Sequence, residues 1–210
     1  MGDSIETRLE RVRAIDVETL ADAIESVGFE CTRCGACCRG TPEEPHVATI
    51  TPDEARRLQG ETDAWRDVAK PVPFGVSNGE GETFEWALAT ECGSCVFYEE
   101  GEDAGRCSAY GDRPLVCRTY PFSLAVDGVT QPLGAAVERT GPLQVHECEG
   151  VGRDIDRAGA LDLARAVKER AVRDLEEEAA VLERYRESDV DAPLVVYDSE
   201  GPKDADGRPL

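Results

Sequence analysis

The sequence predicts an α+β fold with a small, irregular, cysteine-rich centre, short strands around it, helices before it and a long helix after it. Three observations support this prediction. Nine cysteines fall in two groups between residues 31 and 148. The apolar stretches among them are short and are separated by glycine and proline, which is typical of loops and short strands. Apolar residues at helical spacing occur on both sides of this region.

The N-terminal segment, residues 1–28, is predicted to be helical. Ile5, Leu9 and Val12 recur at helical spacing, and the same spacing continues to residue 27, so one or two amphipathic helices are expected over residues 4–27. Gly28 follows directly, in the place where glycine commonly ends a helix.

A third helix is predicted to begin after residue 51. Thr51, Pro52 and Glu54 form a helix-start pattern, with a capping threonine, proline at the first helical position and a glutamate that closes a capping box. This helix is expected to run to about residue 69, with a break at Gly60. Strands are expected at 47–50 and 83–89, and a glycine-rich loop at 74–81.

Asp127-Gly128 is a two-residue hairpin signal, and it predicts a hairpin between strands at 122–126 and 129–136. A long helix is expected over 154–186, with one apolar face docked on the rest of the chain. The last residues are rich in Asp, Gly and Pro, which predicts a loose tail. The domain organisation expected is therefore an N-terminal helical segment, a cysteine-cluster domain, a packed C-terminal helix and an acidic flexible tail: 1–28, 29–152, 153–187 and 188–210.

The charge balance excludes some classes of partner. The chain carries 44 acidic and 23 basic residues, with a net charge of −21. Nucleic acids and anionic membranes bind basic surfaces, so neither is expected as a partner. No apolar run approaches the length of a membrane span, and a cytoplasmic protein is expected.

The basic residues are almost all arginine. Only Lys70, Lys168 and Lys203 are lysines. An excess of Asp and Glu with so little lysine resembles the proteins of extreme halophiles, and a halophilic archaeon is the expected source. In molar salt the Debye length falls to roughly 3 Å, so a highly charged surface repels itself little. The alternative is an acidic protein from an ordinary organism.

The first cysteine group is Cys31-Thr-Arg-Cys34-Gly35-Ala-Cys37-Cys38. Two thiolates two residues apart can point at one ion, and glycine after the second lets the backbone aim N–H groups at sulfur. Neighbouring side chains diverge, so Cys37 and Cys38 are expected to ligate different metal atoms, within one cluster or in two sites. The alternative is that one of the two is a small buried apolar residue.

The second group contains Cys92, Cys95, Cys107, Cys117 and Cys148. In a reducing cytosol, clustered cysteines are more often metal ligands or redox groups than disulfides, although disulfides occur in some extremophiles. Two tetrathiolate sites would use eight of the nine. Sulfur ligands suit zinc or iron–sulfur clusters, and the sequence does not separate these.

These motifs, taken in order, resemble the YkgJ-type cysteine-cluster family, whose domain is described as zinc- or iron-chelating. The hallmark Cys-x-x-Cys-x-x-Cys-Cys lies at 31–38, and the resemblance extends over roughly 29–152. Its later motifs are a Cys followed by an apolar pair, Cys-x-x-Tyr, Arg-Pro-x-x-Cys-Arg, Tyr-Pro-Phe and Cys-x-Gly-x-Gly, which begin here at Cys95, Cys107, Arg113, Tyr120 and Cys148. The resemblance implies that eight cysteines are metal ligands, with Cys92 left over: Cys31, Cys34, Cys37, Cys38, Cys95, Cys107, Cys117 and Cys148.

The resemblance implies a chelating domain without a defined reaction. The leading hypothesis is an iron–sulfur cluster that holds the fold and carries electrons. One alternative is a zinc-organised module that binds a protein partner without catalysis. Another is a modification enzyme, because flagellin lysine-N-methylases carry a related cysteine pattern. The spacing Cys31-x-x-Cys34 differs from the Cys-x-x-x-Cys-x-x-Cys of radical S-adenosylmethionine enzymes, which argues against that class.

No other residues form a recognisable catalytic set, so whether the protein is an enzyme stays open. Asp and Glu are too abundant to single out an acid–base pair. His146 lies two residues before Cys148 and is interpreted as a solvated loop residue rather than a ligand, and His46 has no ligand spacing around it. Arg33, Arg39 and Arg118 lie beside cysteines, where they would either offset thiolate charge or form surface ion pairs.

Overall fold

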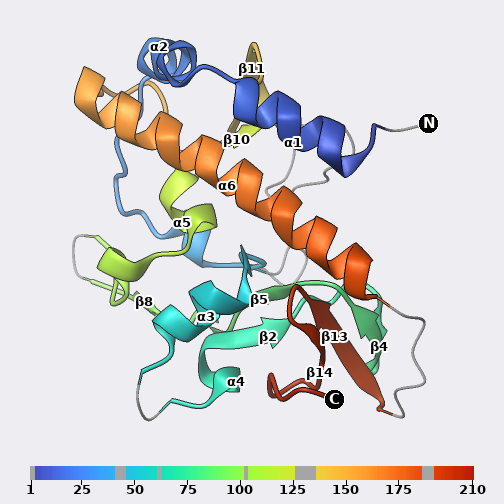
Figure 1. Ribbon diagram of the computed structural model, residues 1–210. Helices are drawn as coiled ribbons and strands as arrows, with labels where there is room; N and C mark the ends of the chain where they lie inside the picture. The colour runs from blue at the N-terminus through green and yellow to red at the C-terminus, as the bar shows by residue number, and fades with distance from the viewer. Residues whose placement is uncertain (1–2, 41–45, 61–62, 102–103, 126–135, 186–191) are drawn as a thin grey trace. The chain divides into compact units, whose positions relative to one another are not determined.

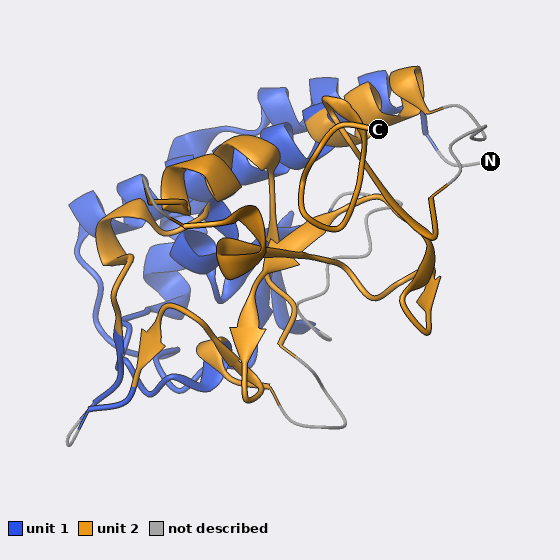
Figure 2. Ribbon diagram, turned by 90° about the horizontal axis from the view of Figure 1, so that it is seen from below, with its two compact units in different colours: residues 1–37, 100–106, 115–176 blue, residues 38–99, 107–114, 177–210 orange. Residues whose placement is uncertain are grey.

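The computed structural model confirms the predicted α+β fold, with helices at the N-terminus and a long helix near the C-terminus (Figure 1). It describes residues 3–40, 46–60, 63–101, 104–125, 136–185 and 192–210. The chain divides into two compact units (Figure 2). Unit 1 contains residues 1–37, 100–106 and 115–176, and unit 2 contains residues 38–99, 107–114 and 177–210.

Two helices begin unit 1, α1 (Ile5–Ala14) and α2 (Val17–Val27), as the apolar spacing predicts. Asp16 caps α2, since its carboxylate accepts a hydrogen bond from the Thr19 N–H at 2.8 Å. Gly28 ends the helix with a φ of 74°, a conformation that favours glycine.

Unit 1 has a conventional apolar core. Helix α6 (Arg157–Arg184), of which the part up to residue 176 lies in unit 1, and α5 (Leu115–Thr119) accompany a sheet in the order β10-β12-β11. These strands span Phe122–Leu124, Leu143–His146 and Ala136–Thr140. The fully buried side chains of this core come from the helices and the sheet: Val12, Leu20, Ala21, Ile24, Phe122, Leu124, Leu143, Val145, Ala160, Ala164, Val167, Ala171 and Leu175.

The expected hairpin around Asp127-Gly128 lies outside the described residues. Within the described residues β10 pairs antiparallel with β12, so the partner of 122–124 is a strand further along the chain than we expected. A described hairpin joins β11 to β12 around Gly141, whose φ is 60°.

Unit 2 contains a three-stranded sheet in the order β1-β5-β2, formed by Thr49–Ile50, Trp86–Leu88 and Ala69–Pro71. Helix α3 (Pro52–Leu58) begins at the predicted capping box, in which the Thr51 N–H donates to the Glu54 carboxylate at 3.1 Å. This helix ends at Leu58 rather than near residue 69. The rest of the expected helix is reduced to the single turn α4 (Trp65–Val68).

The second sheet of unit 2 corrects two expectations. It has the order β14-β13-β4-β3, formed by Gly201–Lys203, Leu194–Asp198, Glu80–Thr83 and Val76–Ser77. The segment expected to be a loose tail thus supplies two strands, because Val195, Val196 and Tyr197 are buried. The expected loop at 74–81 contains a hairpin whose turn is Asn78-Gly79, with φ values of 54° and 80°.

Very short elements carry the cysteines of unit 2. Strands β6 (Thr90–Glu91) and β7 (Ser94–Cys95) form a hairpin, and β8 (Tyr98–Glu99) pairs with β9 (Arg106–Cys107). The described residues also form two 3-10 turns: η1 (Ala36–Cys38), which spans the boundary between the units in the sequence, and η2 (Tyr110–Asp112) in unit 2.

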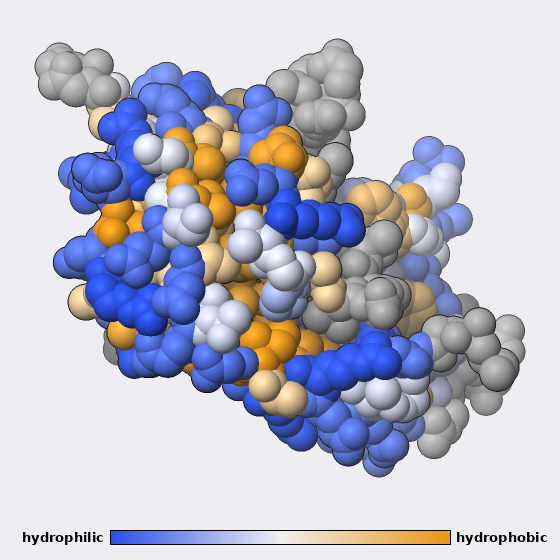
Figure 3. Space-filling view, turned by 90° about the horizontal axis from the view of Figure 1, so that it is seen from above, coloured by the Kyte–Doolittle hydropathy of each residue, from blue (hydrophilic) through white to orange (hydrophobic). Residues whose placement is uncertain are grey.

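The surface agrees with the acidic composition. Hydrophilic side chains cover most of the face drawn in Figure 3, with apolar side chains between them. Among the helices in the described part of the chain, none is both long and apolar enough to cross a membrane.

Candidate metal centre

The first cysteine motif in unit 1 adopts a tight backbone conformation. Arg33 and Gly35, which flank Cys34, both have positive φ values, of 59° and 77°. Glycine adopts this conformation without strain, which explains why it follows Cys34. The motif then enters the 3-10 turn η1, which contains Cys37 and Cys38.

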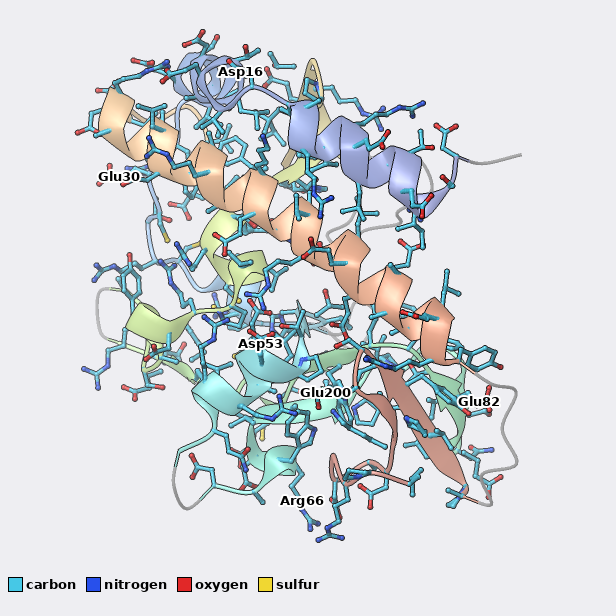
Figure 4. All side chains as sticks on the ribbon, in the orientation of Figure 1. Asp16, Glu30, Asp53, Arg66, Glu82 and Glu200 are labelled. Atoms are coloured by element: carbon cyan, nitrogen blue, oxygen red, sulfur yellow. The ribbon has the colours of Figure 1, made fainter. Side chains whose placement is uncertain are left out.

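A short antiparallel ladder brings Cys148 beside this motif. Phe29 pairs with Val151, and the Glu30 N–H donates to the Gly150 carbonyl at 3.1 Å. Glu30 is labelled in Figure 4 on the segment that leads from α2 into the cysteine motif. A Cβ at position 150 would lie 2.3 Å from the Glu30 carbonyl oxygen, so only glycine permits this approach. Because the pairing is antiparallel, Cys148 lies across from the start of the cysteine motif.

The electrostatics of Cys148 reflect this arrangement. Burial raises the pKa of the Cys148 thiol, and the charges of Cys37, Cys34 and Cys31 raise it further. The Gly150 N–H points at the Cys148 sulfur at 3.4 Å and acts in the opposite direction, because it stabilises a thiolate. Four cysteines of unit 1, from two distant segments, therefore lie within electrostatic reach of one another: Cys31, Cys34, Cys37 and Cys148.

Tyr120 is the aromatic neighbour of this thiol group. Its hydroxyl donates a hydrogen bond to the carbonyl of Glu147, the residue immediately before Cys148. Burial and, after it, the charge of Cys148 raise the pKa of Tyr120 to about 12. The phenol therefore stays protonated, and it fixes the backbone that carries Cys148.

Unit 2 holds a second thiol group. Arg39 forms an antiparallel bridge with Ser94, and the Gly40 N–H donates to the Gly93 carbonyl at 2.8 Å. Cys38 precedes Arg39 and Cys95 follows Ser94, so this single bridge brings together the two segments that carry these cysteines. Cys95 is buried, with 7% of its surface exposed, and Cys38 is partly buried.

The remaining three cysteines have different settings. Cys92 is exposed, and with Gly93 it forms the two-residue turn of the β6–β7 hairpin, where both residues have positive φ values. Cys107 lies on β9 in unit 2, and Cys117 lies on α5 in unit 1; both are partly buried. The boundary between the units falls between Cys37 and Cys38.

The donor chemistry of the unit 1 group suits zinc or an iron–sulfur cluster, because both take thiolate sulfur and both benefit from N–H donors to sulfur. In the part of the chain that the structure describes, no three metal-ligating side chains already lie close enough to hold an ion. Ligation at metal–sulfur distances of ~2.3 Å would require the thiols to draw closer.

One of the two histidines differs from the sequence expectation. His146 is not a solvated loop residue: it lies on β12 with 2% exposure, and its Nε2 shares a hydrogen bond with the Ser123 hydroxyl at 2.8 Å. His46 is partly buried, and burial followed by the positive charge of Lys70 lowers its pKa to about 4. His46 is therefore a neutral imidazole near Lys70, a neighbour that its sequence spacing did not reveal.

Two arginines close to cysteines in the sequence of unit 2 lie over aromatic rings. The Arg39 guanidinium lies over the Tyr98 ring, 5.7 Å from its centroid, and Arg113 lies over Tyr110 at 3.9 Å. In unit 1 the carbonyl of Arg33 accepts a hydrogen bond from the Gly105 N–H at 3.0 Å.

Sequence comparison agrees with this geometry. Residues 30–148, more than half of the chain, match the model of the CxxCxxCC family, described as a "Putative zinc- or iron-chelating domain". The chain belongs to this family. The matched range of the CxxCxxCC domain begins one residue before Cys31 and ends at Cys148, the two segments that the unit 1 ladder joins. Searches of curated proteins and of solved structures found no match.

Proposed function

We propose that this CxxCxxCC protein chelates iron, as an iron–sulfur cluster, or zinc, and that Cys31, Cys34, Cys37 and Cys148 are the ligands in unit 1. The observation that carries the proposal is the approach of Cys148 to the first motif through the Glu30–Gly150 ladder. Four thiols held by two chain segments supply the donor set that tetrahedral zinc and iron sites share.

Unit 2 supplies three further ligands in this proposal. Cys38 and Cys95 adjoin the Arg39–Ser94 bridge, and Cys107 is on the neighbouring hairpin. Cys117 is assigned as a ligand from its place in the family pattern. Cys92 is not assigned as a ligand, because it has no counterpart in the family pattern; it occupies an exposed hairpin turn.

The identity of the metal decides the role. An iron–sulfur cluster would give the protein a redox-active centre, with Gly150 as an N–H donor to a ligand sulfur. Zinc has no redox chemistry, and it would leave the protein a structural module for a protein partner.

The test is elemental analysis of anaerobically purified protein. Iron with inorganic sulfide, brown colour and absorption near ~400 nm would support the cluster, whereas colourless protein with zinc would support the structural module. Cys34→Ala and Cys148→Ala should each lose the metal. Cys92→Asn is the matched control, since asparagine suits the turn conformation, and it should retain full metal content. Protein that purifies without metal and takes up neither iron nor zinc would overturn the proposal.

A further inference from the structure

The three lysines of this chain occupy unusual positions. In a chain where 20 of 23 basic residues are arginine, none of the three lysines is exposed. Lys203 forms an ion pair with buried Asp198 at 2.6 Å, and Lys168 donates to the Arg13 and Ile15 carbonyls at 2.7 Å. Each of these two lysines places its compact ammonium against a defined oxygen acceptor. The acceptor of the third lysine therefore indicates which group that ammonium serves.

That third residue, Lys70, lies beside the unit 2 thiols. Its Nζ donates to the Thr90 hydroxyl at 2.7 Å. Thr90 is the direct cross-strand partner of Cys95 in the β6–β7 hairpin. Directly opposed residues project from the same face of a hairpin, with Cβ atoms about 4.5–5.5 Å apart. The ammonium of Lys70 is therefore held on the face of the hairpin that carries the Cys95 sulfur.

The surroundings strengthen the interaction between these two groups. Cys95 is buried, and Lys70 is partly buried. Burial lowers the pKa of Lys70, and the charge of Cys95 opposes this shift, so the two groups interact electrostatically. Charges screened little by water interact more strongly than charges on the surface. The nearby His46 is neutral and does not compete with the ammonium.

We propose that Lys70, anchored by Thr90, is a positioning residue that compensates the negative charge of the Cys95 thiolate and thereby retains metal at the unit 2 thiols. The inference rests on the proposed chelating function. A thiolate-rich site accumulates negative charge, and unit 2 offsets it with an ammonium, whereas the described donor to Cys148 in unit 1 is a backbone N–H.

The test compares zinc affinity, measured with Zn²⁺ and a competing chelator at fixed pH, between the full-length protein and its variants. Lys70→Met should weaken zinc binding about tenfold near ~0.1 M salt, and because the pair is shielded from solvent, most of the difference should persist in molar salt. Lys70→Arg restores the charge and should recover part of the affinity. Thr90→Val removes the anchor and should give an intermediate loss.

Lys168→Met is the matched control, because it removes the same charge at a lysine in unit 1 whose hydrogen bonds go to backbone carbonyls, and it should leave the affinity within about twofold. Circular dichroism melting identifies variants that fail to fold. If Lys70→Met fails to fold, the zinc affinities of Lys70→Arg and Thr90→Val provide the test instead. Wild-type affinity in Lys70→Met, or an equal loss in Lys168→Met, would overturn the role of Lys70 alone. A wild-type protein that binds neither zinc nor iron would overturn the chelating function and this inference with it.

Discussion

The two units of this protein surround their cysteines in different ways. Unit 1 has a contiguous apolar core, and its thiol group is arranged by backbone: a ladder between residues 29–30 and 150–151, with an N–H donor to Cys148. Unit 2 also buries many apolar side chains, among them Trp86, Leu88 and Val196, and it adds a pair of buried charges, Lys203 and Asp198. Its buried thiol, Cys95, has a lysine on its own face. This difference shows that a small chain can offset the negative charge of a thiolate either with a backbone N–H or with a cationic side chain.

The charge network of unit 2 is centred on Asp198. Its carboxylate has 1% exposure and accepts from Lys203 at 2.6 Å and from the Trp86 indole N–H at 2.8 Å. Glu200, labelled in Figure 4, pairs with Arg56 and also accepts from Lys203 at 2.7 Å. This network joins the C-terminal hairpin to the first sheet of unit 2.

The largest effect is expected from breaking this network. Lys203→Met leaves the buried Asp198 carboxylate without its cation and should lower the free energy of unfolding by about 3–5 kcal/mol, measured by urea titration. Arg208→Met is the control: its guanidinium is 71% exposed in its pair with Asp206, and the loss should stay below about 0.5 kcal/mol. Equal losses in the two variants would show that unit 2 does not depend on the buried pair.

The backbone arrangement of unit 1 is tested at Gly150. Gly150→Ala forces a Cβ against the Glu30 carbonyl oxygen, and it should cost about 2–3 kcal/mol of unfolding free energy and displace Cys148. Gly111→Ala is the matched control, because nothing lies within 4 Å of a Cβ built there. Wild-type stability in Gly150→Ala would mean that the two segments do not approach each other as described.

A smaller effect is expected at Tyr120. Tyr120→Phe removes the hydrogen bond to the Glu147 carbonyl and should cost about 1 kcal/mol. Ultraviolet titration of tyrosinate should show one phenol of the native protein ionising near pH 12, absent from the variant, because burial raises the pKa of Tyr120 to about 12. An unchanged titration curve in the variant would contradict the placement of Tyr120 beside the thiols.

The smallest effect concerns acid stability. The hydrogen bond from Arg56 lowers the pKa of Glu200 from 4.5 to about 2. A carboxyl with a lower pKa in the folded protein stabilises it above the unfolded pKa, and this contribution is lost as pH falls towards the folded value. Both side chains are more than a third exposed, so the contribution is about 0.5–1 kcal/mol. Arg56→Met should flatten the fall in stability between pH 4.5 and pH 2, and an unchanged slope would exclude the pair as its cause.

Local sequence signals predicted where the helices begin and the extent of α1, α2 and α6, but not the end of α3. The Thr51 capping box, Gly28 after α2 and the extent of α6 follow from neighbouring residues alone. The C-terminal strands were missed because Asp, Gly and Pro around residues 194–203 outweighed a short apolar run that becomes stable only beside β4. His146 was misread for the same reason, since only the pairing of β10 with β12 buries it.

The sequence motifs name candidate ligands but not their arrangement in space. The spacing of the motif identifies Cys31 and Cys34 as partners, but the approach of Cys148 depends on a ladder between segments more than a hundred residues apart. Lys70 belongs to no recognisable sequence motif. Its signal was the scarcity of lysine, which marks any lysine that remains as a residue with a specific acceptor.

That scarcity has a practical consequence for chemical labelling. Reagents that acylate primary amines find no exposed lysine on this protein, since Lys70, Lys168 and Lys203 are all partly or fully buried and bonded. Lys70 is partly buried and bonded to Thr90, so its acylation should be slower than that of a free amine, and it should speed up when the β6–β7 region opens. Mass spectrometry of timed acylation would thus report on the surroundings of Cys95 through a lysine.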